Sequence, residues 1–191
     1  ERVSDEDAIP AELVQDIRDM GLFGLSIPEE YGGLGLTMAE EVQAAFVLGQ
    51  TSPAFRSLVG TNNGIGSQGI IIDGTPEQKE RWLPQLASGR TTGCFALTEP
   101  GAGSDATALS TKAVRQGDDF IITGKKCYIT NAPIADLFTL TKNPLPRLAV
   151  VIDVRGGDFF SALSEHLNSL RTRSINLRVL FLEAIDSTPV K

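Results

Sequence analysis

The stretch that decides the fold runs from Phe95 to Asp105 and reads FALTEPGAGSD. Its first three residues, Phe95 to Leu97, are apolar and predict a buried strand, and the Gly and Pro residues that follow predict a turn. Glycines at alternate positions, Gly101 and Gly103, let the backbone approach a bulky ligand without an intervening Cβ atom. Consecutive peptide N–H groups in such a turn can form a concavity that binds anions. The stretch therefore predicts a polar ligand cradle at the end of a strand.

Hydroxyl groups flank this turn, because Thr98 precedes it and Ser104 closes it. A hydroxyl can donate a hydrogen bond to a carbonyl or phosphate oxygen and can accept one in return. The alternative interpretation of the same residues is a plain Gly/Pro turn between two strands, which is the commoner meaning of such a cluster. A second string favours the ligand cradle over the plain turn: residues Gly124 to Asn131 read GKKCYITN about one hairpin farther along the chain.

Together, in this order, the two strings resemble the acyl-CoA dehydrogenase family. In that family a strand ends in a TEPGAGSD loop that touches FAD, and an aromatic-Ile-Thr-Asn segment supplies a second flavin contact. The resemblance extends over residues 10–142 and includes the N-terminal loop that begins at Gly21 and the helix that begins near Gln78. It fades beyond Lys142, where only the outline of the family's later strands is kept.

The periodicity of the chain predicts an α+β fold, with a helical N-terminal domain over residues 1–91 and a β domain over residues 92–191. Ile9, Leu13, Ile17 and Met20 fall on one face of a first helix that begins at Pro10. Two further helices are predicted by capping boxes, Thr37 with Glu40 and Thr75 with Gln78.

Short segments rich in Ile, Val, Phe and Thr alternate with Gly/Asp turns in the second half of the chain, which predicts an antiparallel barrel or sandwich. A hairpin turn is expected at residues 116–119. The expected strands are Cys94–Thr98, Thr111–Arg115, Phe120–Thr123, Cys127–Thr130, Leu137–Thr141 and Leu148–Val154.

The resemblance implies an enzyme, a flavin-dependent oxidoreductase that dehydrogenates an acyl-CoA thioester at its α,β-bond, with hydride transfer to FAD. A family chain is about twice this length, and its third, helical domain supplies the catalytic carboxylate. No catalytic residue is therefore expected here, and a chain of this extent, whether incomplete or a truncated product, is expected to be inactive alone. The residues that the resemblance assigns to the cofactor are Phe95, Leu97, Thr98, Gly103, Ser104, Tyr128, Ile129 and Thr130, and Ser104 is also assigned to the substrate.

Specific roles follow from the same resemblance. Thr98 and the backbone of Leu97 would contact the pyrimidine edge of the isoalloxazine, Thr130 would donate towards N5, and Tyr128 would stack on the ring. The competing interpretations are that both threonines are ordinary strand residues, that Tyr128 is a core aromatic, and that Ser104 is a turn cap. Glu99 is interpreted as a structural anchor of the loop rather than as the base.

The implied partners are an acyl-CoA substrate, an electron-transferring flavoprotein as electron acceptor, and further copies of the chain in a homodimer or homotetramer. Two other classes of function stay open. One is a flavin-dependent oxidase or monooxygenase on the same scaffold, and the other is a non-catalytic remnant.

Composition excludes several other classes. The net charge of −7 argues against binding to nucleic acid or to an anionic membrane, since both need concentrated Lys and Arg. Two cysteines and one histidine offer no metal-ligand spacing, so no metal site is expected. The sequence shows no transmembrane run and no signal-peptide pattern, which favours the cytoplasm, or the mitochondrial matrix in a eukaryote.

Overall fold

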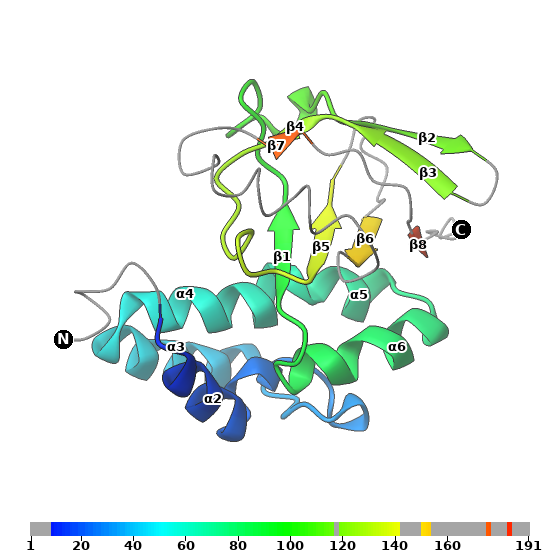
Figure 1. Cartoon of the computed structure of the whole chain (residues 1–191). Helices are drawn as coiled ribbons and strands as arrows, with labels where there is room; N and C mark the ends of the chain where they lie inside the picture. The colour runs from blue at the N-terminus through cyan, green and yellow to red at the C-terminus, as the bar shows by residue number, and fades with distance from the viewer. Residues whose placement is uncertain (1–8, 117–118, 142–149, 154–174, 177–182, 185–191) are drawn as a thin grey trace. The chain divides into compact units, whose positions relative to one another are not determined.

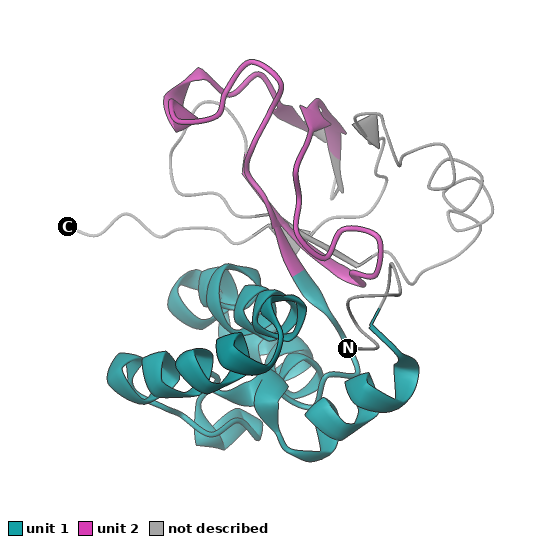
Figure 2. Ribbon diagram, turned by 90° about the vertical axis from the view of Figure 1, so that its left-hand side faces the viewer, with its two compact units in different colours: residues 1–93 teal, residues 94–191 magenta. Residues whose placement is uncertain are grey.

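The structure is a computed structural model of the chain, and it describes residues 9–116, 119–141, 150–153, 175–176 and 183–184. The chain divides into two compact units, residues 1–93 and residues 94–191 (Figure 2). The division falls between residues 93 and 94, whereas the sequence pattern places it between 91 and 92. The first unit is helical and the second contains most of the β structure, so the order of helical and β parts is as expected (Figure 1).

The helical unit begins its helices where the sequence supplies caps. The amide of Thr37 donates to Glu40 Oε2 over 2.8 Å while the amide of Glu40 donates to Thr37 Oγ1. Thr75 and Gln78 form the same reciprocal pair. Both predicted capping boxes are therefore confirmed. The α-helices of this unit are α2 (Ala11–Asp19), α3 (Met38–Thr51), α4 (Pro53–Thr61), α5 (Gln68–Asp73) and α6 (Pro76–Ala87).

Shorter helical turns connect these helices: the 3₁₀ turns η1 (Leu22–Gly24) and η2 (Glu29–Tyr31), and the π segment η3 (Asn62–Gly66). The sequence pattern does not predict α4 and α5, because glycines interrupt the apolar pattern between residues 53 and 74. The pattern also predicts Met20 on the apolar face of the first helix, which is wrong. The helix ends at Asp19, and the side chain of Met20 is 68% exposed.

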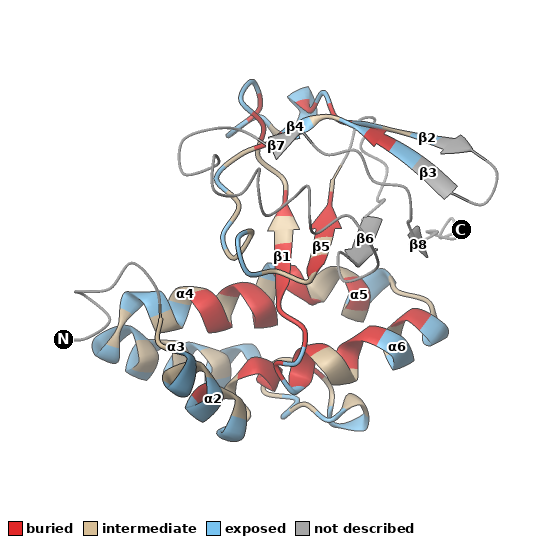
Figure 3. Cartoon of the chain, viewed as in Figure 1, coloured by how far each residue is buried: buried red, intermediate tan, exposed pale blue. Residues whose placement is uncertain are grey.

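Buried residues of the helical unit lie along α4, α5 and α6, among other segments (Figure 3). Most of the buried side chains of this unit are apolar, and two buried asparagines link several of its segments. The side-chain amide of Asn62 donates to the carbonyls of Phe23 and Leu86, and its Oδ1 accepts from the amide of Gly93 over 2.8 Å. Asn63 donates to the carbonyls of Leu22 and Val59. These bonds give the buried side-chain amides of the π segment their hydrogen-bond partners, and they fix the main chain at the start of β1 (Gly93–Ala96).

The second unit contains one four-stranded sheet, in the order β1-β5-β6-β8, and two two-stranded sheets, β2-β3 and β4-β7, within the described residues. Four strand pairs are antiparallel: β2-β3, β4-β7, β5-β6 and β6-β8. Strands β1 and β5 are neighbours whose arrows run in the same direction, so the larger sheet is mixed (Figure 1). The bounds of the later strands are β2 (Lys112–Gln116), β3 (Asp119–Thr123), β4 (Lys125–Lys126), β5 (Leu137–Leu140), β6 (Val150–Asp153), β7 (Ile175–Asn176) and β8 (Glu183–Ala184).

The hairpin of the second unit is confirmed, since Gln116 pairs with Asp119 at the end of the β2-β3 ladder. The strand expected at Cys127–Thr130 is wrong. Tyr128 has a φ of 56° and Asn131 a φ of 67°, and neither value fits an extended strand. The closure of these sheets into a barrel or sandwich stays a prediction, because much of residues 142–191 lies outside the described residues.

Candidate functional site

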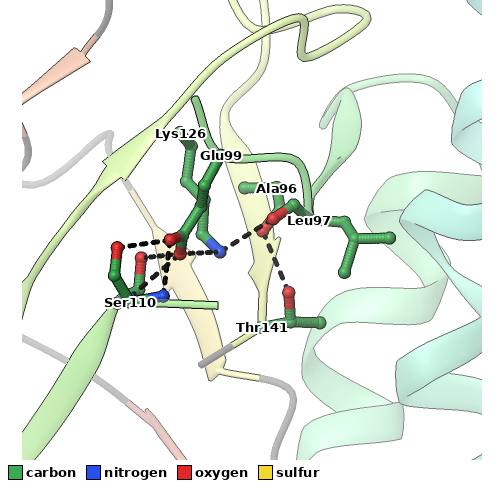
Figure 4. A network of polar contacts seen from close by, with 7 residues as sticks. Ala96, Leu97, Glu99, Ser110, Lys126 and Thr141 are labelled. Carbon is green, nitrogen blue, oxygen red and sulfur yellow. Dashed lines mark hydrogen bonds and ion pairs between the residues drawn. The ribbon is translucent and has the colours of Figure 1, made fainter. Parts of the chain in front are cut away.

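Glu99, in the first motif, is a buried carboxylate that receives hydrogen bonds from the segment before β2 (Figure 4). Its Oε2 accepts from the amide of Ser110 over 2.6 Å and from the hydroxyl of the same residue over 2.5 Å. Its Oε1 accepts from the amide of Thr111 over 3.0 Å and also from the Thr111 hydroxyl. Glu99 is therefore an anchor of the loop, as the sequence analysis interprets it.

Lys126, in the second motif, brings a cation to the same carboxylate (Figure 4). Its buried ammonium lies 2.9 Å from Glu99 Oε1 and also donates to the carbonyl oxygen of Leu97 over 2.9 Å. The ion pair thus links the loop after β1 to β4 and caps a main-chain carbonyl at the end of the strand. A buried pair with this many additional hydrogen bonds meets the condition under which such a pair is tolerated in a protein interior.

The protonation state of Glu99 follows from these contacts. Burial alone would raise the pKa of the carboxyl, but hydrogen bonds from Ser110, Thr111 and Lys126 outweigh burial and bring the pKa to about 2. Burial lowers the pKa of Lys126, and its hydrogen bond with Glu99 opposes that shift. A carboxylate with such a low pKa and with both oxygens occupied is not suited to act as a general base near neutral pH.

The two motifs lie side by side, because the amide of Cys127 donates to the carbonyl of Thr98 over 2.9 Å. The first motif then turns tightly, with Glu99 and Ala102 exchanging amide-to-carbonyl bonds of 3.0 Å in both directions. The residues assigned to the cofactor from the sequence occupy this region in two groups. Half-buried are Phe95, Leu97, Thr98 and Ile129, and exposed are Gly103, Ser104, Tyr128 and Thr130.

Several competing interpretations of these residues can now be decided. Tyr128 is 92% exposed, so it is not a core aromatic. Thr98 and Thr130 lie outside the strands. The cap in this loop is Asp105, whose Oδ1 accepts from the amide of Thr107, and not Ser104. Ile129 lines a small apolar cavity, of about 20 Å³, inside the unit, so its side chain contributes to packing.

The glycines of the first motif leave open space where a ligand could approach. A Cβ atom built on Gly103 would meet no atom within 4 Å, and the same holds for Gly101. Gly124, just before the second motif, is different, because a Cβ there would lie 2.2 Å from Thr111 Oγ1. The exposed glycine, the exposed aromatic ring and the neighbouring hydroxyls are groups that suit a flat heteroaromatic ligand with polar edges, so the residues present fit a flavin.

Three polar residues of this region, Lys126, Ser110 and Thr111, are not among the residues predicted from the sequence. Lys126 lies in the second motif string and Glu99 in the first, so their opposite charges are a signal in the sequence that could have suggested the ion pair. No such signal marks Ser110 and Thr111, because their contact with Glu99 arises only when the chain folds back after the first motif.

No group of three or more His, Cys, Asp or Glu side chains in the described part of the chain could hold a metal ion. No helix in that same part has the length and apolar character needed to cross a membrane.

Comparison with known proteins identifies the family. The family model for the acyl-CoA dehydrogenase N-terminal domain matches residues 1–90, and the model for the acyl-CoA dehydrogenase middle domain matches residues 94–151. The chain therefore belongs to the acyl-CoA dehydrogenase family. These are FAD-dependent oxidoreductases that act on acyl-CoA, which confirms the expectation of FAD as the family's cofactor.

Individual relatives agree with this assignment. The (2S)-methylsuccinyl-CoA dehydrogenase of Cereibacter sphaeroides is 42% identical over 135 residues, which cover 71% of this chain and 24% of that protein. The mitochondrial very long-chain specific acyl-CoA dehydrogenase of Homo sapiens is 39% identical over 134 residues, covering 69% of this chain and 20% of that protein. The chain therefore spans about a quarter or less of the length of these relatives.

A solved structure of glutaryl-CoA dehydrogenase from Mycobacterium smegmatis superposes with a TM-score of 0.70 at 35% identity, over 77% of this chain and 38% of that chain. An acyl-CoA dehydrogenase from Bacillus anthracis, complexed with FAD, superposes with a TM-score of 0.65 at 35% identity, over 75% and 26% of the two chains. The fold of the described units is thus that of the family.

A third family model matches the last part of the chain. The RapZ-like N-terminal domain matches residues 129–191 and overlaps the dehydrogenase middle domain at residues 129–151. Residues 152–191 are matched by the RapZ-like model and not by the dehydrogenase models. The assignment of all of residues 92–191 to one flavin-contacting domain therefore stays a prediction.

Proposed function

We propose that the two motifs of the second unit form part of the FAD-binding surface of a flavin-dependent acyl-CoA dehydrogenase. The observation that carries the proposal is the hydrogen bond from the amide of Cys127 to the carbonyl of Thr98. This bond brings together two segments that lie far apart in the sequence. Each motif also carries an exposed residue assigned to the cofactor, Gly103 in the first and Tyr128 in the second.

Each assigned residue has a task that its chemistry allows. The hydroxyls of Thr98 and Thr130 and the backbone at Leu97 supply hydrogen-bonding groups for the polar edge of the isoalloxazine. The exposed ring of Tyr128 stacks on the cofactor, which contributes about 1 kcal/mol. Gly103 leaves room for close approach, and the exposed Ser104 hydroxyl faces both FAD and acyl-CoA. The half-buried Phe95 and Ile129 support these groups from the interior side.

The proposed reaction is the α,β-dehydrogenation of an acyl-CoA thioester. FAD, when bound, supplies the acceptor for the hydride that leaves the β-carbon. Glu99 is not proposed as the base that removes the α-proton, because it is held as a buried anion with both oxygens occupied. Electron-transferring flavoprotein is the proposed electron acceptor, and the proposed assembly is a homodimer or homotetramer. Oxidase or monooxygenase chemistry and a non-catalytic role are the alternatives.

The proposal is tested by titrating the chain with FAD and following the quenching of flavin fluorescence. We expect saturable binding by the unmodified chain and by Asp105→Asn, but strongly weakened binding by Gly103→Val. Asp105→Asn is the control, since Asp105 is exposed, lies in the same loop and has a capping role that asparagine can take over. Circular dichroism checks that both variants fold. Absence of binding to the unmodified chain, or equal binding by the two variants, would contradict the proposal.

A further inference from the structure

The ammonium group of Lys126 contacts two different groups of the first motif. It pairs with the carboxylate of Glu99, and it donates to the main-chain carbonyl of Leu97, at 2.9 Å in both cases (Figure 4). The neighbouring lysine, Lys125, is exposed. The two adjacent lysines therefore differ in environment, and only Lys126 is directed at the end of the first strand.

The carbonyl of Leu97 and the amide N–H of Thr98 belong to the same peptide group. A cation that donates to the carbonyl oxygen draws electron density towards that oxygen, and hydrogen bonds in such a chain polarise one another. The N–H at the other side of the peptide becomes a stronger donor as a result. The contact also fixes the plane of the peptide, because the carbonyl direction is set by the buried ammonium.

The amide N–H of Thr98 is the donor whose strength this polarisation would raise. The carbonyl of Thr98 is already engaged by the amide of Cys127, whereas the described residues provide no acceptor for the amide N–H of Thr98. Thr98 as a residue is half-buried. A main-chain donor that is shielded from water normally finds a partner, and a ligand atom is a suitable one for this N–H.

We propose that Lys126 is a positioning residue for the cofactor: its ammonium orients and polarises the Leu97–Thr98 peptide so that the Thr98 amide donates to an acceptor atom of bound FAD. This inference rests on the proposed function, and it adds a residue with a defined task to it. Ion pairing with Glu99 alone would stabilise the loop without requiring the second contact to Leu97.

The test compares Lys126→Met, Lys126→Arg and the matched control Lys125→Met. In the ligand-free chain, ¹⁵N-labelled for NMR, Lys126→Met should move the Thr98 amide proton to lower frequency, because the polarising charge is gone. Lys125→Met should leave it in place. In FAD titrations, Lys126→Met should weaken binding about tenfold, and Lys126→Arg should recover most of the affinity.

Because Lys126→Met leaves the Glu99 charge buried without its cation, the double variant Glu99→Gln/Lys126→Met is a second route if the single variant does not fold. A third measurement needs no variant: during FAD titration of the unmodified chain, the Thr98 amide signal should be among those that shift most. FAD binding with no change at Thr98, or equal affinity of Lys126→Met and Lys125→Met, would overturn the inference and leave the proposed function intact. No FAD binding at all would overturn the proposed function and the inference with it.

Discussion

Replacement of Glu99 by glutamine should destabilise the second unit and change the way its stability depends on pH. The side chain keeps its shape, but it loses the charge that pairs with Lys126. Its new NH₂ group also faces other donors, the amides of Ser110 and Thr111 or the ammonium of Lys126. At least one buried donor is then left without an acceptor, which is costly.

The magnitude follows from the pKa of Glu99. Folding lowers that pKa from 4.5 to about 2, a difference that corresponds to about 3 kcal/mol of stability carried by the ionised form. The folded pKa lies below the unfolded one, so this contribution is fully present above pH 4.5 and is lost as the pH falls towards 2. We therefore expect Glu99→Gln to cost about 3 kcal/mol at pH 7, and the difference from the unmodified chain to shrink below pH 4.5.

Native-state hydrogen exchange is the appropriate assay, because it reports the opening free energy of the Ser110 and Thr111 amides themselves. The matched control is Asp105→Asn, an exposed acid in the same loop whose capping role asparagine can take over. The control should change the opening free energy by no more than a few tenths of a kcal/mol. The reasoning is refuted if Glu99→Gln behaves like the control at pH 7, or if its effect is the same at pH 7 and pH 3.

Three further predictions concern the helical unit, where the fluorescence of Trp82 reports unfolding. Gly33→Ala should cost about 3 kcal/mol of folding free energy, because its Cβ would lie 2.0 Å from the carbonyl oxygen of Ile27. Gly49→Ala, whose Cβ would have no atom within 4 Å, should instead stabilise α3 by about 0.5–1 kcal/mol. Equal thermal unfolding midpoints of these two variants would contradict both expectations. Thr37→Ala should cost about 1 kcal/mol through loss of the capping box, and Thr37→Ser should retain most of it; chemical denaturation of the two variants decides the point. Several apolar side chains of α3 are exposed, among them Val42 at 60% and Phe46 at 67%, and they should promote self-association of the chain. Phe46→Lys should therefore increase the monomer fraction in sedimentation. An unmodified chain that is purely monomeric would argue against this prediction.

Local signals in the sequence were sufficient for several elements of the structure. The capping boxes at Thr37 and Thr75 predict the starts of α3 and α6, because both partners of a capping box lie within one turn of helix. The β2-β3 hairpin is likewise a local element. The motif strings predict the family, and the interpretation of Glu99 as an anchor agrees with the structure. All of these depend on residues that are close together in the chain.

Other features depend on contacts between residues that are far apart in the sequence, and no local pattern predicts them. The two asparagines of the π segment donate to carbonyls 24, 39 and 41 residues away, and this support for the glycine-interrupted segment between α4 and α5 leaves no mark in its own sequence. The left-handed backbone of Tyr128 overrides the strand that its β-forming neighbours predict. The pairing of Lys126 with Glu99 and Leu97 arises only when the two motifs meet, because a buried charge is retained where the fold brings it a partner of opposite charge.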